Sequence, residues 1–154
     1  MLIAIIGENC VGKTTLANKI NQSFFATVYS GKDYLRLEKN PSVALEKFKS
    51  MLKDATTGDN VIYLITESEH LKLLPDGAFK IVLTADLQTI KARFKERMRG
   101  NLPMPVEKML EAKHGAFDNL NCNLKLDGNY DINDVIVAIK RSAHKPINDT
   151  LKTS

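Results

Sequence analysis

One stretch near the start of the chain combines the residue types that bind a polyphosphate. It reads Gly7-Glu8-Asn9-Cys10-Val11-Gly12-Lys13-Thr14, which fits the spacing G-x-x-x-x-G-K-[ST] of a phosphate-binding loop, or P-loop. Gly7 and Gly12 permit backbone angles and close approaches that a Cβ atom would block. The amide N–H groups of such a loop can point inward around an anion. The stretch therefore predicts a site for a nucleoside triphosphate.

Side chains of the same loop supply the cation and the metal-binding group. The ammonium of Lys13 is expected at the β- and γ-phosphates, and the hydroxyl of Thr14 can bind the Mg²⁺ that accompanies the nucleotide. A helix that begins at Lys13 would direct the positive end of its dipole at the same anion. The residues expected to bind the nucleotide are Gly7, Asn9, Cys10, Val11, Gly12, Lys13, Thr14 and Thr15.

Length and composition predict one globular domain. The chain has 154 residues, of which 44% are hydrophobic and 26% are charged, so it can bury one full core but not two ordinary ones. The net charge of +4 suits an anionic ligand, although lysines spread over solvated faces would give the same value. We expect the domain to span residues 1–143, followed by a flexible tail over 144–154.

Targeting and cysteine signals are weak. The opening apolar run is too short for a signal peptide or a membrane span. Two cysteines, Cys10 and Cys122, make neither a disulfide framework nor a metal site, so we expect a reduced, cytoplasmic setting. The sequence carries no signal for an oligomeric state.

Short apolar runs alternate with helical patterns along the chain. Strands are predicted over 2–6, 26–30, 61–65, 79–84 and 123–126, and helices from 13 onward, from 41 onward, over 87–99, from 105 to about 114, and over 132–142. This alternation predicts a three-layer α/β/α fold with a five-stranded parallel sheet. Ligands on such sheets bind at the carboxyl ends of the strands. Segments 7–14, 30–33, 66–67 and 84–86 should therefore surround one crevice.

Three side chains beyond the loop are candidates for acceptor or metal binding. Asp33 could orient or deprotonate an acceptor hydroxyl, or hold Mg²⁺ through water, but it could equally cap a helical turn. Arg36, one turn later, could bind an anionic acceptor or be an ordinary surface arginine. Glu67 is the carboxylate nearest the end of the third strand and is favoured as the Mg²⁺-organising acid. The alternative is that Asp33 has that role and Glu67 contacts the acceptor.

The predicted helix 87–99 is the second informative stretch. Its apolar stripe consists of Leu87, Ile90, Phe94 and Met98. Arg93 and Arg97 share a flank of the helix, and arginine is suited to a bidentate grip on a transferring phosphoryl group. A solvated basic face is the alternative. Because a Gly/Pro-broken segment follows, residues 93–115 are predicted to form a short lid. His114 lies at the predicted carboxyl end of the helix that begins at Pro105, where a cation interacts favourably with the helix dipole. A catalytic role for His114 is the less favoured alternative.

The order of these features resembles the small P-loop nucleoside monophosphate and metabolite kinases, such as adenylate, cytidylate and shikimate kinases. The resemblance covers residues 1–143 and is most specific in the P-loop. It implies that Lys13 and Thr14 hold ATP and Mg²⁺ and that Asp33 faces the acceptor. It also implies that Arg93 and Arg97 are lid arginines and that the turn at 127–128 lies near the adenine.

The sequence departs from that family after the second and third strands. Glu67 stands where an aspartate is expected, and 66–69 replaces the glycine triplet of shikimate kinases. Arg36 is the only arginine between the second and third strands, which is few for gripping a nucleotide monophosphate.

These features favour an ATP- and Mg²⁺-dependent phosphotransferase that acts on a small acceptor, either a nucleotide or a hydroxylated metabolite. The alternative is a nucleotide-dependent binding module or regulatory ATPase whose lid region docks a protein partner. A nucleic-acid kinase is disfavoured, because the chain has no basic tract interleaved with aromatics and no tryptophan.

Overall fold

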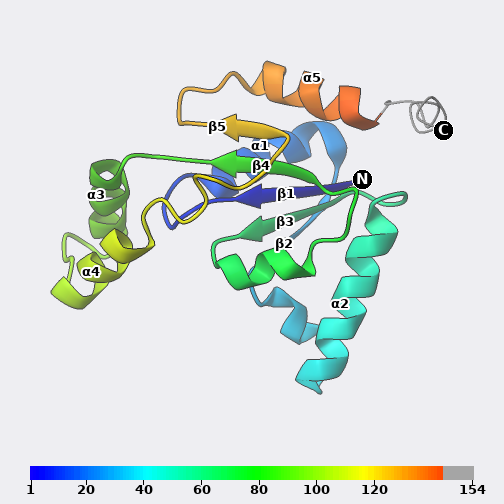
Figure 1. Ribbon diagram of the computed structural model, residues 1–154, viewed down its shortest axis with the longest axis horizontal. Coiled ribbons are helices and arrows are strands. Elements are labelled where there is room, and N and C mark those ends of the chain that lie inside the picture. Colours follow the sequence, from blue (N-terminus) through cyan, green and yellow to red (C-terminus); the bar gives the residue numbers. More distant parts are fainter. Residues whose placement is uncertain (144–154) are drawn as a thin grey trace.

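The apolar run at the start of the chain forms the central strand of a parallel sheet in the computed structural model, which describes residues 1–143. β1 (Leu2–Ile6) lies between β3 (Val61–Ile65) and β4 (Phe79–Leu83). β2 (Thr27–Ser30) pairs with β3 at one edge, and β5 (Leu124–Leu126) pairs with β4 at the other. The order β2-β3-β1-β4-β5, parallel throughout, confirms the predicted five-stranded sheet (Figure 1). The tail predicted over 144–154 lies outside the described residues.

Helices and 3-10 turns join successive strands, and a last helix follows β5. They are α1 (Lys13–Phe24), η1 (Asp33–Arg36), α2 (Pro41–Ala55), η2 (Ser68–Leu73), α3 (Leu87–Arg97), α4 (Met104–Lys113) and α5 (Ile132–Ala143). The 3-10 turn η2 was not predicted. α3 ends two residues before the predicted boundary, and α4 begins one residue before Pro105.

Alternating side chains of the central strands enter two separate cores. Ile3 and Ile5 face the core that contains Leu16 and Ile20 of α1 and Ile139 of α5. In the other core, Leu2, Ala4 and Ile6 pack with Phe48 and Leu52 of α2. Every residue of β1 and β3 is buried, as expected of a sheet covered on both faces. α1 and α5 lie over one face and α2 over the other, which confirms the three-layer arrangement (Figure 1).

α3 and α4 lie beyond the carboxyl ends of the strands, beside the P-loop (Figure 1). Lys91 of α3 joins the two helices by contacting Glu107 at 3.2 Å and Glu111 at 2.8 Å on α4. Ile90 of α3 is buried, but Met98, which follows the last residue of α3, is 41% exposed. The predicted apolar stripe therefore contacts the core only along its first turns. Within residues 1–143, no helix has the length and apolar character needed to cross a bilayer.

Candidate active site

Two glycines allow the P-loop to join β1 to α1. The N–H of Gly7 donates to the carbonyl oxygen of Ile65 at 3.0 Å, and a Cβ atom on Gly7 would lie 2.6 Å from the carbonyl oxygen of Leu83. Gly12 has φ of +99°, and its carbonyl accepts the first helical bond of α1 from Leu16 N–H at 3.1 Å. An L-residue would clash at the first position and be strained at the second. The loop thus has the conformation that its motif predicts.

Lys13 reaches back across the loop. Its Nζ donates to the carbonyl oxygens of Gly7 at 2.8 Å and Glu8 at 2.7 Å. Burial lowers the pKa of Lys13 to about 8; Cys10, Glu8 and Glu67 partly oppose this shift, and the positive charge of Arg97 adds to it. A bound polyanion would favour the charged ammonium form.

A hollow of about 430 Å³ lies on one flank of the loop and is called here the β5-side hollow. It is lined by Cys10, Val11, Gly12, Thr15, Lys19, Arg93, Arg97, Gly128 and Tyr130. Nη1 of Arg93 donates to the carbonyl oxygen of Cys10 at 3.0 Å. The ammonium of Lys19 lies 5.1 Å from the centre of the Tyr130 ring. The structure thus brings both α3 arginines and the 127–128 turn region to a hollow that P-loop residues also line.

A smaller hollow of about 70 Å³ lies on the other flank and is called the β3-side hollow. It is lined by Glu8, Asn9, Thr66, Glu67, Ser68, Leu110, Lys113, Ala116 and Phe117. Lys113 Nζ donates to both carboxylate oxygens of Glu67 at 2.9 Å. Nδ1 of His114 lies 2.9 Å from Oε1 of Glu8, and Gly115 N–H donates to Oε2 of Glu8 at 3.3 Å. The carboxyl end of α4 therefore contacts two carboxylates beside the P-loop.

Asp33 and Arg36 lie at the β2 edge of the sheet and bind each other. Oδ2 of Asp33 accepts from Ser30 N–H at 2.9 Å, which matches a capped turn, and Oδ1 accepts from Arg36 Nη2 at 2.9 Å. The pair is exposed on the arginine side, where the Arg36 side chain is 81% accessible. Neither residue lines the hollows that flank the P-loop.

The residues present fit a metal ion that arrives with a nucleotide. Thr14 is exposed at the start of α1, and the carboxylate of Glu67 lies close enough to raise the pKa of Lys13. Within residues 1–143, no three His, Cys, Asp or Glu side chains form a metal-binding group. Mg²⁺ commonly binds through one or two protein groups together with substrate phosphates, and the Thr14 hydroxyl and the Glu67 carboxylate are groups of that kind.

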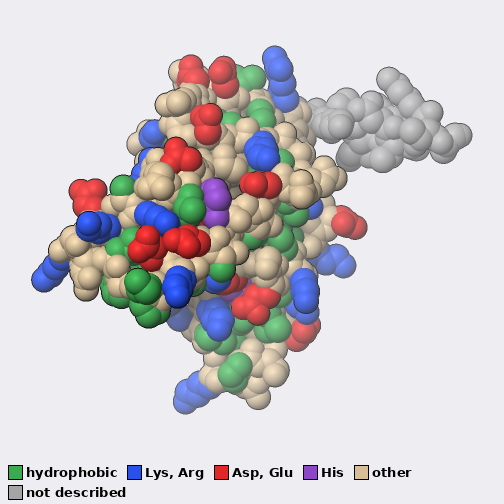
Figure 2. Space-filling model, turned by 60° about the vertical axis from the view of Figure 1, so that its left-hand side comes forward, with side chains coloured by type: hydrophobic (Ala, Val, Ile, Leu, Met, Phe, Trp, Pro, Cys, Tyr) green, Lys and Arg blue, Asp and Glu red, His purple; other side chains and the backbone are tan. Residues whose placement is uncertain are grey.

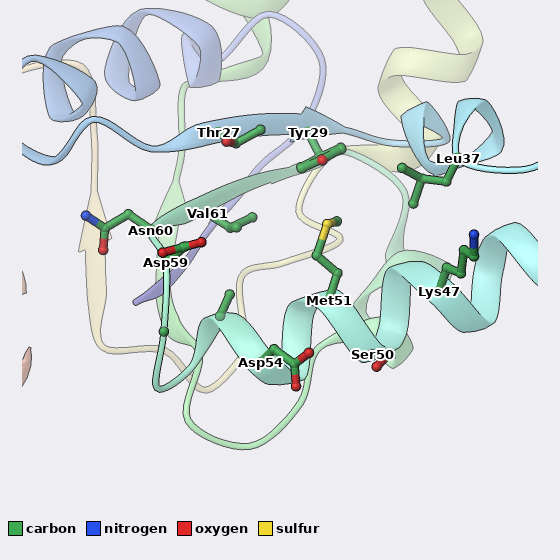
Figure 3. Close-up of a pocket in the computed structure, with 12 residues that line it drawn as sticks. Thr27, Tyr29, Leu37, Lys47, Ser50, Met51, Asp54, Asp59, Asn60 and Val61 are labelled. Atoms are coloured by element: carbon green, nitrogen blue, oxygen red, sulfur yellow. The ribbon is translucent and has the colours of Figure 1, made fainter.

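A larger hollow lies away from the P-loop. It measures about 720 Å³ and lies between β2 and α2, with Thr27, Tyr29, Met51 and Asp54 on its walls (Figure 3). None of its lining residues belongs to segment 7–14 or to α3. A candidate site chosen by the volume of its hollow alone would therefore miss the residues suited to binding phosphate.

Charges of both signs are interleaved on the face that α3 and α4 form (Figure 2). Sequence reasoning singled out Arg93 and Arg97 there but assigned no binding role to Glu8 or Lys113. Glu8 occupies a variable position of the P-loop motif, and Lys113 carries only the signal of a cation at a helix end. Their proximity arises because the chain returns to the loop after α4.

No protein-family model and no curated protein sequence matches the chain. Solved structures do match over nearly its whole length. A gluconokinase from Sinorhizobium meliloti 1021 is 10% identical with a TM-score of 0.59, covering 99% of this chain and 97% of that chain. YorR from Bacillus subtilis, solved in complex with phosphorylated GDP, is 20% identical with a TM-score of 0.63, covering 95% and 99%. A shikimate kinase from Aquifex aeolicus vf5 is 18% identical with a TM-score of 0.59, covering 95% and 100%.

These similarities agree with the topology and with the position of the P-loop between β1 and α1. They extend over both cores and the α3–α4 region, because the coverage leaves out few residues. The chain has the three-layer α/β/α fold of the small P-loop kinases.

Proposed function

We propose that the protein is an ATP- and Mg²⁺-dependent phosphotransferase that moves the γ-phosphoryl group to a small acceptor. The observation that supports this most directly is the position of Arg93 and Arg97 in the hollow that adjoins the P-loop. A P-loop alone suffices to bind a nucleotide, but guanidinium groups from a separate helix suit the charge that develops on a transferring phosphoryl group.

In this proposal, the loop amides and Lys13 hold the triphosphate, and its base extends toward Gly128 and Tyr130. Thr14 and, through water, Glu67 would hold Mg²⁺, which would supply positive charge against the phosphates. Arg93 and Arg97 would contact the phosphoryl group as the bond to the β-phosphate oxygen breaks and the bond to the acceptor oxygen forms.

Asp33 is proposed to orient the acceptor hydroxyl and take its proton, with Arg36 assisting acceptor binding. Because these two side chains pair with each other, the salt bridge must open for either to contact the acceptor. At an exposed site such a pair contributes little stability, so opening it is inexpensive.

The test is ADP production from Mg·ATP, with and without a panel of small alcohols, sugars, hydroxy acids and nucleotides. The proposal expects turnover that rises with one acceptor class. Tight nucleotide binding, measured calorimetrically, with turnover that stays flat across the panel would contradict transfer. That outcome would favour the nucleotide-dependent binding module, tested by pull-down with and without an ATP analogue.

A further inference from the structure

The β3-side hollow lies where a phosphoryl acceptor would meet the nucleotide. The two hollows flank the P-loop from opposite sides, and the one with Gly128 and Tyr130 has room for a base. Glu8 lines the smaller hollow, and its carbonyl oxygen accepts from Lys13 Nζ at 2.7 Å. A terminal phosphate held by Lys13 would therefore face the β3-side hollow.

Charge in this hollow disfavours an anionic ligand. Among its described lining residues there are two carboxylates, Glu8 and Glu67, and one ammonium, that of Lys113. The ammonium is already bound to both oxygens of Glu67. Lys13 is directed at the nucleotide phosphates in the proposed function. A phosphate or carboxylate on the acceptor would thus meet the carboxylate of Glu8 and an ammonium that is already paired with Glu67.

Shape and polarity favour a small hydroxylated molecule. Leu110 and Phe117, which are 3% and 4% exposed, give the hollow an apolar wall. Asn9, Thr66 and Ser68 supply groups that can donate to and accept from a hydroxyl. A volume of about 70 Å³ has room for a hydroxyl-bearing arm of a few atoms.

Resting on the proposed function, we propose that the β3-side hollow is the acceptor subsite and that its substrate is a small alcohol without a phosphate or carboxylate group. Glu67, paired with Lys113, is then a specificity-determining residue. The Glu67–Lys113 pair removes from the hollow the one cation that an acidic acceptor would need.

The experiment compares related acceptors with and without an anionic group. Glycerol is compared with glycerate and glycerol 3-phosphate, a hexose with its aldonate and its 6-phosphate, and a nucleoside with its monophosphate, with ethanolamine as a cationic alcohol. Both kcat/KM and binding to protein saturated with a non-hydrolysable ATP analogue are measured. We expect an uncharged or cationic member to exceed its anionic counterpart by at least about tenfold.

Variants test the charge argument independently of overall activity. Glu67→Gln frees Lys113, so the ratio of anionic to uncharged acceptor, in kcat/KM or in binding, should rise at least about tenfold. Adding Lys113→Met to the same chain should remove that rise. Glu46→Gln, the same chemical change on an exposed side chain of α2, should leave the ratio unchanged.

The possible failures are distinguishable. If neither Mg·ATP nor its analogue binds, the proposed function fails and this inference fails with it. If the nucleotide binds and an anionic acceptor is preferred or equal, transfer stands but the charge argument is overturned. If the nucleotide binds and no alcohol of the panel binds or reacts, the assignment of this hollow as the acceptor subsite is overturned.

Discussion

Arg93 of α3 donates from Nη1 to the carbonyl oxygen of Cys10 in the P-loop at 3.0 Å, across 83 residues of sequence. This contact attaches the α3–α4 region directly to the loop that would hold a triphosphate. It also places a guanidinium group at the rim of the β5-side hollow, where Arg97 contributes a second one. The relationship makes Arg93 and Arg97 the first targets for mutation.

Replacing Arg93 or Arg97 with Ala should lower kcat by at least about tenfold, because such groups stabilise charge on the transferring phosphoryl. Nucleotide affinity, measured by calorimetry, should persist, since the loop amides and Lys13 remain. Arg141→Ala on α5 is the matched control. An unchanged kcat in both variants would contradict this role and would favour the alternative, in which the two arginines only form a solvated basic face of α3.

Nucleotide affinity should depend on pH through Lys13. Burial lowers its pKa to about 8 in the free protein, and a bound triphosphate would raise that pKa. Below pH 8 the ammonium of Lys13 is present in both the free and the nucleotide-bound protein, so nucleotide affinity does not change with pH. Above pH 8 binding must take up a proton, so affinity should fall by up to about tenfold per pH unit. Calorimetry between pH 7 and 9.5, in buffers of different ionisation enthalpy, measures both the affinity and the proton uptake. Lys13→Met should bind more weakly and without this pH dependence.

Gly7→Ala should destabilise the fold as well as the site. The new Cβ would lie 2.6 Å from the carbonyl oxygen of Leu83 and 2.7 Å from Cγ2 of Val11. Overpacking of this kind lowers the free energy of unfolding by about 1–3 kcal/mol, which urea denaturation can measure. Gly128→Ala is the control, because nothing lies within 4 Å of its Cβ position. Equal stability of the two variants would contradict the close approach at Gly7.

Asp33→Asn separates the two readings of that residue. The amide oxygen can still accept from Ser30 N–H, so the turn is kept, but the charge and the proton acceptor are lost. If Asp33 serves the acceptor, kcat/KM for the acceptor should fall at least about tenfold while nucleotide affinity changes less than about twofold. Asp54→Asn, on an exposed position of α2, is the control. Full activity would leave Asp33 as a turn cap.

Much of the architecture followed from local patterns. Period-two and continuous apolar runs identified all five strands, and the glycines at 7 and 12 identified the loop, because both signals lie within a few consecutive residues. Helix boundaries were less accurately predicted than the helices themselves. Met98 continues the apolar periodicity of α3 but lies past its last residue and is exposed. The turn η2 carried no periodic signal that could predict it.

The sequence by itself determined the phosphate-binding loop, the parallel sheet and the alternation of strands and helices, since spacing along the chain specifies each of them. Only the tertiary structure decided that Lys113 and His114 meet Glu67 and Glu8. These contacts join residues 46 and 106 positions apart. They depend on where the chain is carried after α4, and no local propensity encodes that path.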